Sequence, residues 1–177
     1  MDPESLQRLV ETEEINFSVC EEMLRKTNNV IEAGELRGIT IRFLESYPDH
    51  PVLLVLRALS ESLSEDCDDT VVLDSLRQLL GPAVDKYSVT QSTLDEAVGL
   101  IARVAENRSP RLFPALLLAI EEGEYTTIDR SVTYDELCRR GLKAGSEEVY
   151  DLVILARLRE NVDRLKTVMG ILSLENS

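Results

Sequence analysis

Residues 43–63 read FLESYPDHPVLLVLRALSESL, and this stretch decides the fold class. It joins the end of one predicted helix, through a turn marked by Pro48 and Pro51, to a helix that is apolar almost all round. Residues 52–56 of that second helix are consecutive apolar residues, and one face of a helix cannot hold five neighbours. A helix of this kind must be surrounded by others, so the stretch predicts the central helix of an all-α domain.

The composition agrees with a helical domain of ordinary size. Hydrophobic residues make up 44% and charged residues 29% of the 177 residues, which is typical of a globular chain with a sizeable core. Only 5% of the residues are aromatic and none is Trp, so the core must be built from aliphatic residues and Ala. We expect a single domain over residues 1–177, with the polar stretch 124–132 as a candidate internal boundary.

Proline, glycine and capping residues predict the helix boundaries in the first half of the chain. The second predicted helix carries Phe17, Cys20, Leu24 and Ile31 at helical spacing, which places Ile31 on its apolar face. The predicted boundaries are a helix start at Pro3, helix ends at Gly34 and Pro48, an N-cap at Asp49 and a helix over 71–80.

In the second half, two capping boxes open predicted helices at Thr93 and Thr133. Gly123 and Gly141 are predicted helix ends. Ser146 is the predicted cap of the longest helix, which extends to about Leu174. The predicted fold is therefore eight or nine α-helices, arranged as antiparallel helical hairpins in a short α-solenoid or an irregular bundle, with a long C-terminal helix.

Two segments of the chain echo each other. Residues 38–45 and 99–106 keep a Gly, an Arg and a Glu in step, and each is soon followed by a proline and an apolar helix. The echo indicates either a repeated helix–turn–helix unit, as in stacked α-solenoids, or features that any two helical hairpins share.

Residues 35–63 resemble the junction between two tetratricopeptide repeats. The resemblance consists of an amphipathic helix, the turn Tyr47-Pro48-Asp49 and an apolar helix that contains Ala58-Leu59. It implies paired antiparallel helices whose concave face binds peptides or partner proteins. The Trp-Leu-Gly-Tyr pattern of that family is absent, and the later hairpins do not keep its period.

The net charge of −14 argues against a general binder of nucleic acid or anionic membranes, because phosphates attract basic surfaces. Residues 139–177 carry 6 acidic and 7 basic side chains, so the acidic excess lies in the first three quarters of the chain. Residues 134–159 could form a helix-turn-helix reader of nucleic acid. We favour it less, because Glu147, Glu148 and Asp151 would repel phosphates at the start of the recognition helix.

No constellation for catalysis is evident. His50 is the only histidine, so a catalytic base has no second candidate; its place beside two prolines predicts a surface or capping role. The scattered glycines form no phosphate loop, and the acidic loop 64–69 lacks the ligand spacing of a calcium site. We therefore expect no enzymatic activity, no cofactor and no metal.

The cysteines and the start of the chain indicate a cytoplasmic location. Cys20, Cys67 and Cys138 are odd in number and far apart, which predicts reduced, partly buried thiols. The start MDPESLQRL has no signal region, and no apolar run approaches the roughly 20 residues of a membrane span.

The last predicted helix carries the most regular apolar seam in the chain. Its 3-4-3-4-3 spacing is that of a coiled coil, which indicates self-association or docking to a partner helix; packing on the domain's own core is the alternative. The residues of the seam are Leu155, Leu158, Val162, Leu165, Met169 and Leu172.

The pattern as a whole predicts a non-enzymatic protein–protein interaction module, such as an adaptor or assembly subunit. Its partner would be another protein or a second copy of the chain, with no nucleic acid and no membrane. The alternative is a small acidic enzyme or metal-dependent protein without a recognisable motif.

Overall fold

The structure is a computed structural model that describes residues 3–12, 15–122, 130–144, 147, 149, 151 and 166–170, without the side chains of 130–134. This part of the chain contains helices and no strand, so the all-α prediction is confirmed. The helices with defined bounds are α1 (Pro3–Glu11), α2 (Ser18–Arg25), α3 (Val30–Ser46), α4 (Pro51–Leu63), α5 (Asp69–Leu80), α6 (Pro82–Lys86), α7 (Gln91–Asn107), α8 (Leu112–Glu122) and α9 (Arg130–Lys143).

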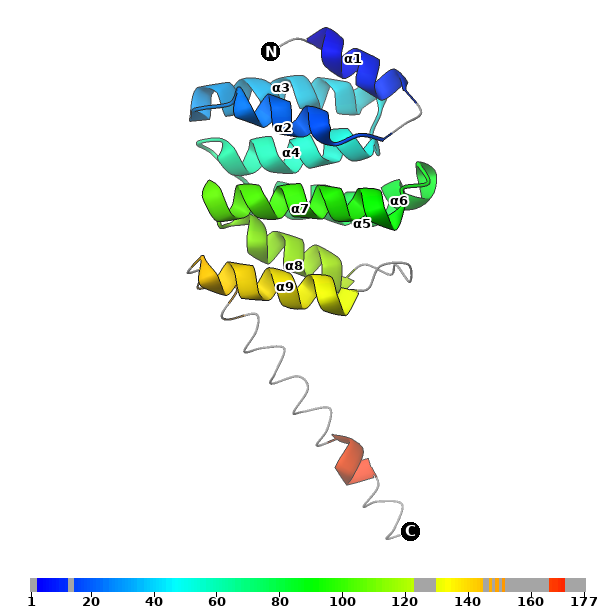
Figure 1. Cartoon of the computed structure of the whole chain (residues 1–177), viewed down its shortest axis with the longest axis vertical. Coiled ribbons are helices and arrows are strands. Elements are labelled where there is room, and N and C mark those ends of the chain that lie inside the picture. Colours follow the sequence, from blue (N-terminus) through cyan, green and yellow to red (C-terminus); the bar gives the residue numbers. More distant parts are fainter. Residues whose placement is uncertain are drawn as a thin grey trace.

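Helix α4 is the centre of the arrangement, as the apolar run 52–56 predicts. All of its residues except Arg57 and Leu63 are buried. It packs mainly between α3 and α5, and it also contacts α2 and α7. Figure 1 shows the helices stacked along the long axis of the molecule, from α1 at one end to α9 at the other.

The hydrophobic core is a cluster of buried side chains that extends from Leu6 in α1 to Val149. Helix α5 continues it from α4 to α8, and α8 continues it to α7 and α9. Its buried members are mainly Leu, Val, Ile and Ala, with Phe17 and Phe113 as the aromatic residues, in agreement with the composition.

The predicted boundary at Gly34 is wrong. Helix α2 ends at Arg25, and α3 begins at Val30 because the side chain of Asn29 accepts a hydrogen bond from the backbone N–H of Glu32 at 2.9 Å. Gly34 therefore lies inside α3. Ile31 is 72% exposed instead of contributing to the core.

The N-cap of α4 is His50 and not Asp49. The Nδ1 atom of His50 accepts a hydrogen bond from the backbone N–H of Val52 at 3.3 Å. Pro51 occupies the first turn, where a missing N–H removes no helical hydrogen bond.

The predicted start of α7 at Thr93 is also wrong, because Thr90 is the N-cap and accepts a hydrogen bond from the backbone N–H of Thr93 at 3.2 Å. Similarly, α9 begins at Arg130, so residues 130–132 are helical and Thr133 is not the start.

Gly141 does not end α9, which continues to Lys143. A Cβ atom at Gly141 would come within 2.8 Å of Cγ2 of Val149, so the glycine allows a close approach to that residue. The rest of the stretch 124–132, Gly123, Ser146 and most of the predicted C-terminal helix lie outside the described residues.

Candidate functional site

An open cleft lies between α2 and α7. It consists of two neighbouring hollows of about 550 Å³ and about 260 Å³, whose linings share Glu21, Leu100 and Arg103. We call it the α2–α7 cleft. The residues that line it include Asn16, Phe17, Ser18, Glu21, Leu24, Arg25, Thr27, Asn28, Asp95, Glu96, Gly99, Leu100, Arg103, Val104, Asn107 and Arg108.

The two helices that form the cleft run in the same direction. One hollow is lined by residues near the start of both helices, from 16 to 21 and from 95 to 103. The other is lined by residues near their ends, from 21 to 28 and from 100 to 108. In Figure 1, α2 and α7 lie on opposite sides of α4, which contacts both. The central helix therefore supports both walls of the cleft.

Apolar side chains form the floor of the cleft. Leu24, Leu100 and Val104 line it and are at most 7% exposed, so only a small part of each faces the cleft. Beneath them, the buried thiol of Cys20 lies 3.9 Å from the backbone oxygen of Val52 and connects α2 to α4. Burial raises the pKa of the Cys20 thiol, which keeps it protonated and unreactive.

Charged side chains divide the cleft into two ends of opposite sign. Arg25 and Arg108 lie at the end formed by the last turns of both helices. Asp95 and Glu96 lie at the other end. Glu21 and Arg103 form an ion pair between the two ends, and their side chains are 41% and 54% exposed. The cleft is therefore basic at one end, acidic at the other and neutral in the middle.

Arg108 holds the end of α2 against the end of α7. Its Nη1 and Nη2 atoms donate hydrogen bonds to the backbone oxygens of Leu24 at 3.2 Å and Thr27 at 2.6 Å. The Leu24 carbonyl also accepts a hydrogen bond from the backbone N–H of Thr27 at 3.1 Å, so Arg108 is an additional donor at the end of α2. By contrast, Arg25 is exposed and has no hydrogen-bond or ion-pair partner within the described part of the chain. Its guanidinium group is free to meet a ligand.

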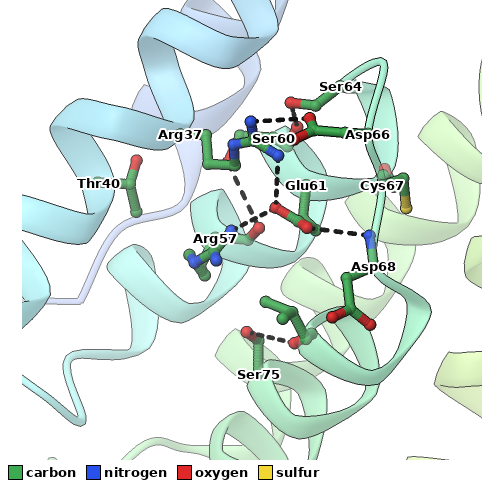
Figure 2. Close-up of polar contacts among 12 residues, drawn as sticks. Arg37, Thr40, Arg57, Ser60, Glu61, Ser64, Asp66, Cys67, Asp68 and Ser75 are labelled. Atoms are coloured by element: carbon green, nitrogen blue, oxygen red, sulfur yellow. Dashed lines mark hydrogen bonds and ion pairs between the residues drawn. The ribbon is translucent and has the colours of Figure 1, made fainter.

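A second polar site is the Glu61 cluster, which consists of Arg37, Arg57, Glu61, Asp66 and Asp68 (Figure 2). The Oε2 atom of Glu61 accepts hydrogen bonds from Nη1 of Arg57 at 2.7 Å and from Nη1 of Arg37 at 3.2 Å. Its Oε1 atom accepts one from the backbone N–H of Asp68 at 3.0 Å. Arg37 also pairs with Asp66 at 2.9 Å. The cluster connects α3, α4 and the loop before α5.

The chemistry of the Glu61 cluster is structural. The Glu61 side chain is 4% exposed, and this burial alone would raise its pKa. Hydrogen bonds from Arg57, the Asp68 backbone and Arg37 outweigh burial, so the pKa of Glu61 is lowered and the carboxylate stays charged. Both of its oxygens are occupied by donors within the fold, which leaves the group poorly suited to act as a base or a ligand. The described residues contain no cluster of potential metal ligands.

His50 is 1% exposed and combines the capping bond to Val52 with an edge contact to the ring of Tyr87, at 5.1 Å between ring centroids. The capping prediction is confirmed, and the surface prediction is wrong. Burial lowers the pKa of His50 to about 4, so the ring is neutral at physiological pH. Its Nε2 atom has no hydrogen-bond partner among the residues that the structure describes.

The structure tests little of the predicted C-terminal seam. Met169 is 59% exposed and lies in the helical segment 166–170. Leu155, Leu158, Val162, Leu165 and Leu172 lie outside the described residues, so an interface along the seam stays a prediction. Cys20 and Cys138 are buried and Cys67 is half-buried, and no disulfide joins these three cysteines.

Sequence reasoning did not find the α2–α7 cleft. Its walls are two amphipathic helices that each look ordinary, and α3 to α6 separate them in the chain. The echo at Gly99 and Arg103 was the one signal that pointed to this part of α7.

None of the described helices combines the length and the apolar character that crossing a membrane requires. Comparisons with protein-family models, with curated proteins and with solved structures found no match to this chain.

Proposed function

We propose that this chain is a non-enzymatic protein–protein interaction module, an adaptor or assembly subunit of antiparallel helical hairpins, that binds a segment of a partner protein in the α2–α7 cleft. The observation that carries the proposal is the cleft itself, which is open and elongated, with an apolar floor between charged walls. The resemblance of residues 35–63 to tetratricopeptide repeats agrees with it.

The dimensions of the cleft suit a peptide better than a small molecule. From Asp95 to Asn107, α7 extends for about 20 Å, at about 1.5 Å per residue. That length accommodates about four turns of a partner helix or about six residues of an extended chain. Small-molecule sites are usually enclosed, whereas a helix laid in a groove needs one open side.

Blocking the cleft tests the proposal. Gly99 lines the cleft, and a Cβ atom there would meet only Nη1 of Arg103, at 3.8 Å. A large side chain in Gly99→Trp therefore has room to enter the cleft without striking the backbone. Gly38 is the matched control, because it also lies inside a helix and a Cβ atom there meets nothing within 4 Å.

The binding partners for this test come from an unbiased library of random dodecapeptides displayed on phage. Selection against the wild-type protein should yield peptides whose affinity, measured by fluorescence anisotropy, falls at least tenfold in Gly99→Trp and is unchanged in Gly38→Trp. Circular dichroism melts establish that both variants are folded. Failure to select any peptide, or equal binding by wild type and Gly99→Trp, would overturn the proposal.

A further inference from the structure

We infer that the segment bound in the α2–α7 cleft changes the sign of its charge along its length, with carboxylates at the end near Arg25 and basic side chains at the end near Asp95. The inference rests on the proposed function and adds the chemical class of the partner.

The Arg25 end of the cleft is basic within a chain of net charge −14. Arg25 has no partner in the described part of the chain, and Arg108 donates to backbone oxygens, so no carboxylate neutralises either guanidinium group. The carboxylates near this end are engaged elsewhere: Glu22 pairs with Lys26 at 3.5 Å, and Glu32 accepts from the backbone N–H of Asn28 at 3.0 Å. Carboxylates of a partner are the groups that complement this end.

The other end of the cleft has the opposite sign. Asp95 and Glu96 are both exposed, and neither has an ion-pair partner within the residues that the structure describes. A uniformly acidic segment would be repelled here, and a uniformly basic segment would be repelled by Arg25 and Arg108. Only a segment with separated charges is attracted at both ends.

Uncharged side chains of a bound segment suit the middle of the cleft. Glu21 and Arg103 neutralise each other there, and the buried Leu100 lines both hollows. A charged side chain in the centre of the segment would compete with this ion pair, whereas an aliphatic one would not. The partner segment is therefore acidic, then apolar, then basic.

Two synthetic dodecapeptides of identical composition test the inference. One carries glutamates at one end, leucines and alanines in the middle and lysines at the other end; the second carries the same residues interspersed. Fluorescence anisotropy at low ionic strength should show the segregated peptide binding at least about fivefold tighter, because each exposed charge pair contributes modestly. Equal binding of the two peptides, or binding of neither, would overturn the inference.

Charge reversal locates the effect. Arg25→Glu and Asp95→Lys should each weaken binding of the segregated peptide several-fold, and added salt should weaken it further. Arg42→Glu on α3, which reverses an exposed charge outside the cleft, is the matched control and should leave binding unchanged.

The outcomes separate the two proposals. If library peptides bind and Gly99→Trp blocks them, but Arg25→Glu has no effect, then the charge inference fails and the proposed function stands. If Gly99→Trp blocks nothing, the proposed function fails with it.

Discussion

The Glu61 cluster and the Glu21–Arg103 pair both join glutamate to arginine, but they differ in burial. Glu61 is 4% exposed and accepts hydrogen bonds from two arginines and one backbone N–H. The Glu21 side chain is 41% exposed, and Arg103 is its ion-pair partner among the described residues. Burial makes the loss of one partner costly in the first arrangement, whereas water can replace either partner in the second. Burial, more than residue type, therefore decides whether a charge pair stabilises the fold or stays available for binding.

Removing the buried carboxylate should have the largest effect. Glu61→Ala leaves Arg37 and Arg57 without their shared acceptor, and breaking a buried pair in this way typically costs about 3–5 kcal/mol. We expect the free energy of unfolding, measured by urea denaturation, to fall by about that amount. Glu65→Ala is the control, because Glu65 is exposed and should change stability by less than about 0.5 kcal/mol. A similar loss in both variants would remove the distinction between the two regions.

His50 is a second buried titratable group, and it differs from Glu61 because burial keeps it neutral. Its pKa is about 4 in the folded protein against 6.5 ordinarily, so between these values the unfolded chain binds more protons. Stability is therefore highest above pH 6.5 and is lost as pH falls, by about 1 kcal/mol between pH 7 and 5.5. Urea denaturation at the two pH values measures the loss.

The control for His50 is His50→Asn, which retains a capping side chain and removes the only histidine. Its stability should change little between pH 7 and 5.5. The same pH dependence in this variant would assign the loss to other groups.

The smallest change in the free energy of unfolding is expected for the ion pair in the cleft. Because its pair is about half exposed, Glu21→Gln should change the free energy of unfolding by no more than about 0.5 kcal/mol. Urea denaturation of Glu21→Gln and Glu61→Ala under the same conditions compares the two losses of stability directly. A loss of several kcal/mol in Glu21→Gln would mean that the pair holds α2 in place and is not available for exchange with a ligand.

Local sequence patterns predicted the helices and the central position of α4 well, because the apolar run 52–56 permits no other placement. They failed at helix ends, where side chains compete for the capping position. Asn29 caps α3 ahead of the expected break at Gly34, and Thr90 caps α7 ahead of Thr93. A sequence offers several capping residues within a few positions, and tertiary packing chooses among them.

The cleft could not be predicted, because it depends on which helices α4 brings together. The echoed segments illustrate this. Within the described part of the chain, Arg42 donates only to the backbone oxygen of Gly38 in its own helix, at 3.4 Å, whereas the equivalent Arg103 reaches Glu21 of α2. The two arginines occupy the same place in the pattern, and their neighbours in the fold give them different roles.

The hydrogen bonds from Arg108 to the end of α2 have a consequence for local opening. If helix α2 detaches from the molecule, the carbonyls of Leu24 and Thr27 lose this donor. Fraying at the end of α7 removes the donor itself. We therefore expect the ends of these two segments, which are far apart in the chain, to open together. A ligand bound to both would slow hydrogen exchange in α2 and α7 together, even in amides that it does not touch.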